Sequence, residues 1–423
     1  MAIDPEELKQ RRAQRQQQRQ KQQRGAVVKL VVAGVVLVLC GVLIFSIAGK
    51  RDEKPTGGDN QTAASDGQTQ ETAGTEETLP AQTVIHMAAA GDLNVSESVV
   101  ASGGMEYSYT NTLMDVAHLL ADADVTALNF EGNLYGAPYG TDRSAPQTLA
   151  EALANAGVDM VQLANSYSIY KGMEGLRETI NGIRLAGMEP LGVYASAKDA
   201  QAGKGYTICN VRGVKIAFVA FTKGMDGMAL PPGNEGCVNV LYTDYSTDYQ
   251  QVDTEGISKV LDAAAKESPD LTVALLHWGS EFNNTISESQ KDICKLMQEK
   301  GVDAIIGTHS HYVQKIEFDR DAGTFVAYSL GDFLGDAQRA GSEYSVVLNL
   351  EITKDNTTGQ TKITNYNYVP IFTVTEEGKP LRVVRIREAM KAYEDGYIDR
   401  ISQESYNAMK YALERIEARV NGK

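Results

Sequence analysis

The most apolar part of the chain is a single run, LVVAGVVLVLCGVLIFSIA, from Leu30 to Ala48. None of its 19 residues carries a charge, and Lys29 and Lys50 bracket it. At 1.5 Å per residue, a helix of this length spans roughly 28 Å, which is close to the thickness of the hydrocarbon core of a bilayer. We therefore predict a transmembrane helix over residues 30–48.

Basic residues gather on one side of this run. The segment before it carries eight Lys and Arg, whereas the stretch after it is mixed and acidic. Because basic flanks stay in the cytoplasm, we expect residues 1–29 to be a cytoplasmic tail and the rest of this single-pass chain to be extracytoplasmic. The alternative is a cleaved signal peptide with Ser46-Ile47-Ala48 as its cleavage site, but the apolar run is too long to favour it.

Residues 49–83 are polar and rich in Thr, Gln, Gly and Glu. Such a segment cannot bury enough apolar surface to offset the loss of chain entropy on folding, so we predict a disordered linker. It would hold the folded part of the chain away from the bilayer.

From residue 84 onward, short β-rich runs alternate with helical periodicity. The pattern predicts strands at 83–90, 125–130, 158–163, 206–211, 215–221, 271–276, 303–306, 313–318, 325–329, 344–352 and 366–373. It predicts helices at 145–156, 172–186, 254–267, 287–300 and 402–419. Alternating βα units followed by a β-rich stretch indicate a layered α/β fold. We assign one domain to residues 84–375 and a C-terminal helical extension to residues 376–423.

Composition and charge narrow the function classes. Of the 423 residues, 43% are hydrophobic and 22% are charged, which excludes disorder of the whole chain. The net charge of −15 divides into +6 for residues 1–50 and −21 for the remainder. An acidic body of this kind is not expected to bind nucleic acid.

The four cysteines constrain the fold little. Cys40 lies in the predicted membrane helix, and the sequence has no Cys-x-x-Cys motif, which excludes a zinc knuckle or a redox motif. The sequence allows a disulfide between Cys209 and Cys237. With Cys294 the count outside the membrane is odd, which favours three buried thiols.

Polar side chains recur where the predicted strands end. These candidate metal ligands are Asp92, Asn129, Glu131, Asn165, His277, His309 and His311. Because sites in open α/β sheets form at the carboxyl ends of strands, we expect these side chains to lie together. A set of nitrogen and oxygen donors without sulfur suits Mn, Zn or Fe, and two such ions can hold a phosphate between them.

Each of these positions also has a structural interpretation. Asp92, Asn129 and Glu131 could cap turns, and His277 beside Trp278 could be a packed core histidine. The pair His309 and His311 is more specific, because two histidines at this spacing after an apolar strand are seldom needed for packing. His86 and His118, within a predicted strand and a helical stretch, are left out of the site.

Six motifs occur in a fixed order along the chain. They are AAGDLN at 89–94, ALNFEGN at 127–133, QLANSYSIYKGMEGLRETI at 162–180, LLHWGSEF at 275–282, IIGTHSHYVQKIE at 305–317 and AYSLGDFLGD at 327–336. Together they resemble the CapA family of bacterial capsule and poly-γ-glutamate synthesis proteins. The resemblance covers residues 84–350 and implies a four-layer αββα, metallophosphatase-like fold. It also implies that the strand-end residues hold one or two divalent ions, with Asn129 orienting the site and Glu281 close by.

The chain departs from the family pattern at three positions. Tyr167 stands where the family has a histidine, which in related phosphoesterases protonates the leaving group and contributes roughly 10²- to 10⁴-fold to the rate. Thr308 replaces a frequent histidine, and Asp332 replaces an asparagine and adds a negative charge. Tyr167 is thus the only candidate catalytic residue, and we expect altered or weakened hydrolase activity.

Three functions fit this sequence. The first is a membrane-anchored component of capsule or poly-γ-glutamate synthesis or export, in which a polymer synthase and the anionic polymer would be partners. The others are a surface metal-dependent hydrolase of phosphoesters or polymer amide bonds, and a non-catalytic module that binds an anionic ligand. The acidic body would repel a polyanion, so local cations such as Lys171, Arg177 and Arg339 are candidates to attract one.

Overall fold

The computed structural model describes residues 2–3, 81–397 and 401–422. The predicted membrane helix at residues 30–48 lies outside them, as do nearly all of the predicted tail and linker. None of the helices in the described ranges has both the length and the apolar character needed to cross a membrane. The predicted membrane topology therefore stays a prediction.

Two β-sheets form the centre of the described chain. The seven-stranded sheet has the order β1-β6-β7-β8-β9-β11-β10, from β1 (Ala2–Ile3), β6 (Tyr206–Val211), β7 (Val214–Thr222), β8 (Leu271–His277), β9 (Ala304–Thr308), β11 (Thr324–Ala327) and β10 (Ile316–Asp319). The eight-stranded sheet has the order β15-β14-β13-β2-β3-β4-β5, with β12 paired to β2. Its strands are β15 (Arg382–Arg385), β14 (Thr361–Val374), β13 (Tyr344–Asp355), β2 (Gln82–Asn94), β3 (Val125–Glu131), β4 (Met160–Gln162), β5 (Glu189–Leu191) and β12 (Asp332–Leu334).

Helices lie between the strands and after the last of them. They are α2 (Glu97–Ala101), α3 (Thr110–Leu113), α4 (Ala117–Ala121), η1 (Thr141–Arg143), α5 (Gln147–Ala156), α6 (Gly172–Leu185), α7 (Ala197–Gly203), α8 (Thr254–Ala265), α9 (Glu288–Glu299), α10 (Ile386–Glu394) and α11 (Gln403–Val420). Strands β2 to β5 run parallel, as do β7 to β9. Parallel neighbours place their carboxyl ends at the same edge of a sheet.

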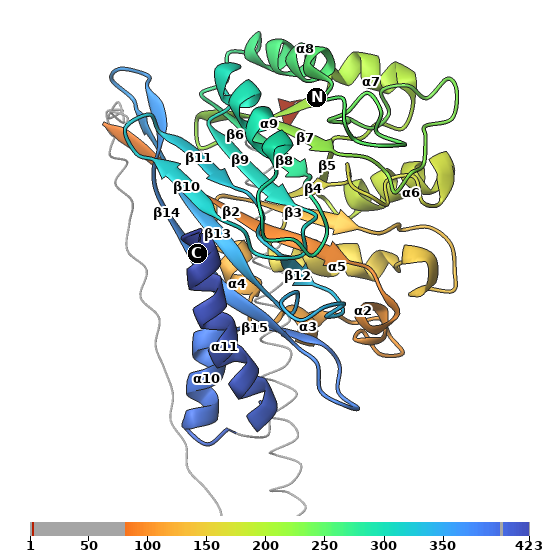
Figure 1. Ribbon diagram of the computed structural model, residues 1–423, viewed down its shortest axis with the longest axis vertical. Helices are drawn as coiled ribbons and strands as arrows, with labels where there is room; N and C mark the ends of the chain where they lie inside the picture. Colours follow the sequence, from red (N-terminus) through yellow and green to blue (C-terminus); the bar gives the residue numbers. More distant parts are fainter. Residues whose placement is uncertain (1, 4–80, 398–400, 423) are drawn as a thin grey trace, which may run out of the picture. The chain divides into compact units, whose positions relative to one another are not determined.

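Three apolar layers hold these elements together. The first lies between the two sheets and includes Phe218 of β7 and Leu348 of β13. The second packs α5 and α6 on the outer face of the eight-stranded sheet, and the third packs α8 and α9 on the outer face of the other sheet. Figure 1 shows α8 and α9 on one side of the sheets and α4 and α5 on the other. The predicted mixed α/β class, with sheets inside helices, is confirmed.

Most of the predicted elements occur close to their expected bounds. Strands β6 and β7 pair as the predicted hairpin, and Arg212 and Gly213 turn it with φ angles of 52° and 85°. Ser287 caps α9 through a capping box with Gln290, as its position at the predicted start of that helix suggests. The strands that the pattern missed, β1, β5, β12 and β15, have only two to four residues each.

The region after residue 375 was expected to be helical throughout, but it begins with a β-strand. Residues 382–385 form β15, which pairs with β14 because Val383 and Val384 are buried in the core. The helices α10 and α11 follow. Apolar residues of α11, among them Met409 and Ile416, pack into the layer between the sheets.

The three cysteines in the described ranges are buried thiols that form no disulfide. Cys209 lies in β6 and Cys237 precedes the bridge of Val238 with Val193, and no disulfide joins them. Their packing as small apolar side chains is the favoured sequence interpretation.

Candidate metal centre

The alternation of side chains along the strands carries the predicted ligands into the space between the sheets. In β8, the odd-numbered residues of 271–275 face the other sheet, and His277 continues that face. In β3, the odd-numbered residues of 125–127 have the same direction, so Asn129 and Glu131 also point inward. The predicted ligands are the last residues of these strands, so their polar side chains lie at the carboxyl edge of the apolar layer.

Asp92 reaches the same space because β2 is irregular. Its odd-numbered residues 85–89 face inward, and the pairing with β3 shifts its register between Ala90 and Asp92, so that Asp92 turns inward. The close approach of β2 to Gly331 requires a glycine at position 91, since a Cβ atom there would lie 1.7 Å from the Gly331 carbonyl oxygen. The Asp92 amide donates to that same oxygen over 3.0 Å.

Glu131, His277 and His309 form the first group of side chains that could hold a metal ion. One ligand atom from each residue lies within 4.8 Å of the others. The Nε2 atom of His277 is 3.3 Å from Oε1 of Glu131, and the rings of His277 and His309 are 4.4 Å apart. All three residues are buried.

Asp92, His311 and Asp332 form a second such group within the same distance limit. The Nδ1 atom of His311 is 2.8 Å from Oδ1 of Asp332 and 4.0 Å from Oδ2 of Asp92. Oδ2 of Asp92 also accepts a hydrogen bond from the backbone amide of His309 over 2.9 Å. This bond ties the second group to the first.

Asn129 and Asn165 connect the groups through their amides. The Nδ2 atom of Asn129 donates to Oδ1 of Asp92 over 2.6 Å and lies 3.4 Å from Nδ1 of His277. Asn165 in turn donates to Oδ1 of Asn129 over 3.1 Å and to the backbone oxygen of Phe130 over 2.7 Å. The structure thus brings all seven predicted residues together, with both asparagines acting as connectors in this arrangement.

Asp332 was noted in the sequence only as an added charge, and the structure makes it part of the second group. Its Oδ2 atom is buried and has no hydrogen-bond partner among the described residues. Asn94 donates to its Oδ1 atom over 3.1 Å. A sequence signal existed, because Gly331-Asp332 after an apolar run repeats the pattern of Gly91-Asp92.

The backbone at the two nearby histidines is strained. His309 has a φ angle of 86° and His311 one of 57°, both in the left-handed region that disfavours residues with a Cβ atom. Strain of this kind persists where the surrounding structure enforces it, and it is common at functional sites.

Burial sets the charge states in this space. Burial raises the pKa of Asp92 and lifts that of Glu131 well above its ordinary value, and it raises the pKa of Asp332 to about 6. Burial also lowers the pKa of His277 and His309 far below the usual range, which leaves neutral imidazoles.

His311 behaves differently from the other two histidines. Burial acts to lower its pKa, but the carboxyl groups of Asp332, Glu131 and Asp92 outweigh that effect and raise the pKa to about 10. In the protein without metal, a proton on His311 therefore balances part of the negative charge of these three side chains.

The donor chemistry fits divalent metal ions. Neutral imidazoles and carboxylates are the ligands that Mn, Zn and Fe accept, and each group offers both kinds. The buried Oδ2 atom of Asp332, which lacks a partner, is the type of atom that an ion would satisfy.

Tyr167, the predicted catalytic residue, lies beside this centre. Its backbone amide donates to Oδ1 of Asn165 over 3.0 Å, and its hydroxyl accepts a hydrogen bond from Nη2 of Arg143 over 2.8 Å. Burial raises its pKa to about 12, although Arg143 opposes the shift. The Ser166 hydroxyl, one residue earlier, lies 3.1 Å from Nε2 of His277.

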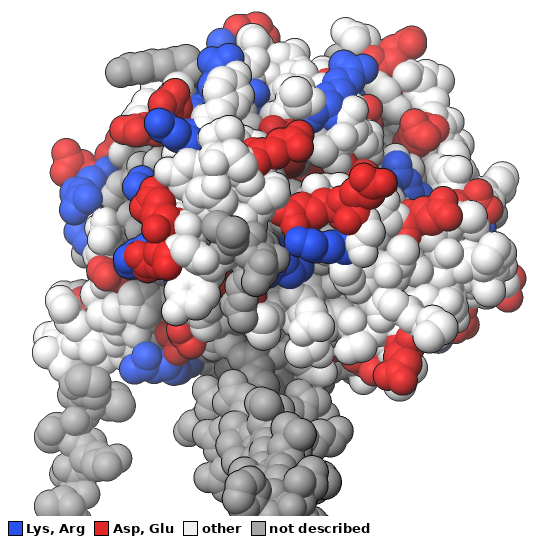
Figure 2. All heavy atoms as spheres, turned by 90° about the horizontal axis from the view of Figure 1, so that it is seen from below, with Lys and Arg blue, Asp and Glu red and all other residues white. Residues whose placement is uncertain are grey.

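The three cations proposed to attract a polyanion have separate positions. Lys171 forms an ion pair with Asp142 at 3.0 Å, and Arg177 donates to a backbone oxygen. The guanidinium of Arg339 lies 4.6 Å from the ring of Phe282, and that ring stacks on His311. On the face in Figure 2, acidic and basic side chains are interspersed and neither forms a continuous patch.

One further residue near the centre, Lys223, escaped sequence analysis. Lys223, directly after β7, donates to the backbone oxygen of Gly279 over 2.9 Å and lies 4.6 Å from the ring of Tyr249. Its charge contributes to the low pKa of His277 and His309. Glu281, which the family resemblance placed nearby, is exposed and lies close enough to oppose the lowering of the Lys223 pKa that burial causes.

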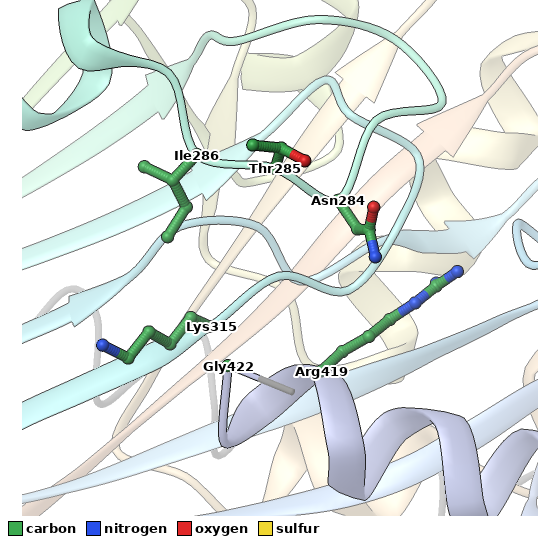
Figure 3. Close-up of a pocket in the computed structure, with 6 residues that line it drawn as sticks. All are labelled: Asn284, Thr285, Ile286, Lys315, Arg419 and Gly422. Atoms are coloured by element: carbon green, nitrogen blue, oxygen red, sulfur yellow. The ribbon is translucent and has the colours of Figure 1, made fainter.

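A separate cavity of about 280 Å³ lies near the end of α11 and contains none of the predicted ligands. It is lined by Asn284, Thr285, Ile286, Lys315, Arg419 and Gly422. Its two cations extend toward opposite ends in Figure 3. Lys315 is paired with Glu317, and Arg419 stacks on Tyr312 at 4.5 Å, so both have partners within the protein.

Comparison with known families agrees with the motifs. Residues 86–337 match the family of the bacterial capsule synthesis protein PGA_cap, and the chain belongs to that family. The resemblance to CapA proteins is therefore confirmed.

The chain is similar to two CapA proteins from Bacillus. The chain is 26% identical over 305 residues to the capsule biosynthesis protein CapA of Bacillus anthracis, a match that covers 70% of this chain and 68% of the relative. It is 27% identical over 218 residues to the PGA biosynthesis protein CapA of Bacillus subtilis, covering 51% of this chain and about half (52%) of that relative.

Two of the solved structures with a partial likeness are a phosphoesterase and a phosphatase. The calcineurin-like phosphoesterase YfkN from Bacillus subtilis aligns with a TM-score of 0.44 at 16% identity, over 78% of this chain and 99% of that chain. A phosphatase from Mycoplasma pneumoniae aligns with a TM-score of 0.41 at 13% identity, over 69% of this chain and 94% of that chain.

Proposed function

We propose that this protein takes part in the synthesis or export of an anionic capsule polymer of the poly-γ-glutamate type, and that it does so through a cleft that binds divalent metal. Membership in the capsule synthesis family supports the process. The observation that carries the proposal is the convergence of Asp92, Glu131, three histidines and Asp332 on two buried ligand groups. Surfaces that only pack have no need for so many ionisable side chains in one dry space.

The residues that would hold metal are those of the two groups. Glu131, His277 and His309 would bind one ion, and Asp92, His311 and Asp332 would bind a second. Bound divalent ions would supply positive charge to attract and polarise oxyanions. Asn129 would keep the groups in register through its bond to Asp92.

The fold supports a metallophosphatase-like arrangement of four αββα layers. Two sheets face each other, helices cover both outer faces, and the ligands lie at the carboxyl ends of β2, β3, β8 and β9. This is where open α/β sheets form their sites.

Ligand binding is favoured over fast hydrolysis. A general acid works best when its pKa is near the ambient pH, and Tyr167 has a pKa of about 12. The phenol can donate a hydrogen bond but transfers a proton poorly at neutral pH. A surface hydrolase of phosphoesters or polymer amide bonds is the second candidate, supported by the two adjacent ligand groups.

For location, we propose a bacterial membrane protein that is anchored by residues 30–48 and places its large domain outside the cell, next to a polymer synthase. The apolar run and the basic residues before it support this topology. The pairing of Ala2–Ile3 with β6 opposes it, because it would place the N-terminus on the side of the domain. Protease treatment of intact spheroplasts separates the two: an N-terminal tag is protected in the proposed topology and is removed in the other.

An allelic replacement tests the functional proposal. Asp92→Ala removes a ligand of the second group, and Asp321→Ala changes an exposed aspartate in the β10–β11 turn and serves as the control. We expect Asp92→Ala to reduce the surface polymer as far as gene deletion does, while the control leaves it unchanged. Normal polymer in the Asp92→Ala strain, with the protein present at its usual level, would contradict the proposal.

A further inference from the structure

Arg143 and Tyr167 form a pair at the side of the candidate metal centre. The Nη2 atom of Arg143 donates to the Tyr167 hydroxyl over 2.8 Å, and the guanidinium carbon lies 4.2 Å from the centre of the tyrosine ring. The Nη1 atom donates to the backbone oxygen of Val95 over 3.1 Å. The guanidinium is therefore fixed from two directions.

The backbone around Arg143 has a strained conformation. Asp142 and Arg143 have φ angles of 48° and 57°, both in the left-handed region. The backbone oxygen of Arg143 accepts a hydrogen bond from the Asn133 amide over 2.7 Å, which holds the segment in place. An irregular, strained segment that fixes a cation is more consistent with recognition than with folding alone.

The pair keeps several donors free. A guanidinium has five N–H groups, and the contacts with Val95 and Tyr167 use two of them. Because the Tyr167 oxygen accepts from Arg143, its own proton points elsewhere, and no acceptor for it exists within the part of the chain that the structure describes. Donors of this kind, aimed from an arginine and a phenol, match the oxygens of a carboxylate or a phosphate.

Space for a ligand adjoins the pair. A cavity of about 390 Å³ is lined by Arg143, and Tyr170 on its wall packs edge-on against Tyr167, with ring centres 5.6 Å apart. Arg143 is close enough to act on the carboxyl groups of Glu131 and Asp332, one from each ligand group.

We propose that Arg143 and Tyr167 form an oxyanion subsite, which holds one carboxylate or phosphate group of the ligand beside the metal centre. The subsite specifies the ligand of the proposed function and rests on it. Glu97, Asp142 and Asp336 also line the cavity, and Asp142 is paired with Lys171. The carboxylates of Glu97 and Asp336 repel any anion in the cavity, so the attraction for the oxyanion has to come from Arg143 and the Tyr167 hydroxyl.

Isothermal titration of the full chain with inorganic phosphate, and separately with acetate, tests the subsite after the metal content of each sample has been measured. Arg143→Gln removes the charge, Arg143→Lys keeps it without the fork geometry, and Tyr167→Phe removes one donor. Arg184→Gln is the matched control, since Arg184 lies on α6 and its Nη2 atom is paired with Oε1 of Glu189 at 3.7 Å. The anion that binds more tightly identifies the ligand group.

We expect Arg143→Gln to weaken anion binding about tenfold or more, Tyr167→Phe to weaken it severalfold, and Arg143→Lys to fall between them. The control should stay within about twofold of the unaltered chain, which is the range of a surface change. If thermal melting shows that the Arg143 variants are unfolded, the anion affinity of Tyr167→Phe alone tests the subsite.

The subsite is wrong if the unaltered chain binds neither anion, or if Arg143→Gln and Tyr167→Phe bind both as tightly as the unaltered chain. Bound metal together with that result leaves the proposed function standing and removes only the subsite. If anion binding depends on Arg143 in a chain that takes up no metal, the subsite is supported and the proposed metal-binding function is contradicted.

Discussion

The Nδ1 atom of His311 lies 2.8 Å from Oδ1 of Asp332, and both side chains are buried. A buried histidine would ordinarily be neutral, yet this one has a pKa of about 10 because the surrounding carboxyl groups outweigh its burial. The pair is therefore an ion pair in the metal-free protein, and His311 would have to lose its proton in order to hold a metal ion.

Asp332→Asn should weaken the second ligand group. The substitution preserves shape and removes one negative charge, so the affinity for the weaker-bound ion is expected to fall about tenfold or more, in line with the loss of a direct or supporting carboxylate. Titration with Mn²⁺ or Zn²⁺ followed by metal analysis measures this effect. Asp321→Asn, on an exposed turn, is the control, and equal metal binding by the two variants would show that Asp332 is not a ligand.

Metal binding should release protons and strengthen as pH rises. His311 has a pKa of about 10 without metal, so near neutrality it must lose a proton in order to ligate. One released proton corresponds to a roughly tenfold gain in apparent affinity for each pH unit below that pKa. Calorimetry in buffers of different ionisation enthalpy counts the protons, and an affinity that is flat between pH 6 and 8 would contradict the assignment of His311.

Removal of divalent metal should lower the thermal stability of the chain. The carboxyl groups of Asp92, Glu131 and Asp332 are buried, and an ion that binds only the folded state adds about 2.7 kcal/mol at a concentration one hundred times its Kd. We expect melting to shift down by a few degrees in a chelator and to recover with Mn²⁺ or Zn²⁺. Recovery with Mg²⁺ alone would indicate a different set of ligands.

Gly91→Ala should disrupt the site through the backbone. The new Cβ atom would meet the Gly331 carbonyl oxygen at 1.7 Å, so β12 must move and carry Asp332 with it. Overpacking of this kind costs about 1–3 kcal/mol, and urea unfolding should detect it together with weaker metal binding. Gly359→Ala is a comparison with open space around it, where only the strain of its positive φ angle applies. Equal stability and equal metal binding in both variants would show that the approach of Gly91 to Gly331 does not matter.

The sequence predicted much of the candidate site because regular strands determine side-chain direction. Glu131 and His277 point inward since they continue the alternation of β3 and β8, a period that can be read without a structure. Strand ends also coincide with changes from apolar to polar residues. The class of the fold followed from the same pattern of alternating strands and helices.

The site residues that sequence analysis missed lie in segments where no regular alternation of side chains can be recognised. Asp332 belongs to a strand of three residues, too short for alternation to be visible, and its partner strand β2 is far away in the chain. Arg143 lies in an irregular segment whose left-handed backbone no sequence pattern indicates. Both residues are positioned by long-range packing, which local propensity does not report.

The central claim is that the two groups bind divalent metal, and the metal content of the full chain tests it most directly. The chain would be purified without chelators, and its bound ions would be counted by mass spectrometry beside those of Asp92→Ala and His277→Ala. We expect one or two ions of Mn, Zn or Fe per chain, with fewer in each variant. A chain that carries no divalent ion and takes up none when Mn²⁺, Zn²⁺ or Fe²⁺ is supplied would contradict the account.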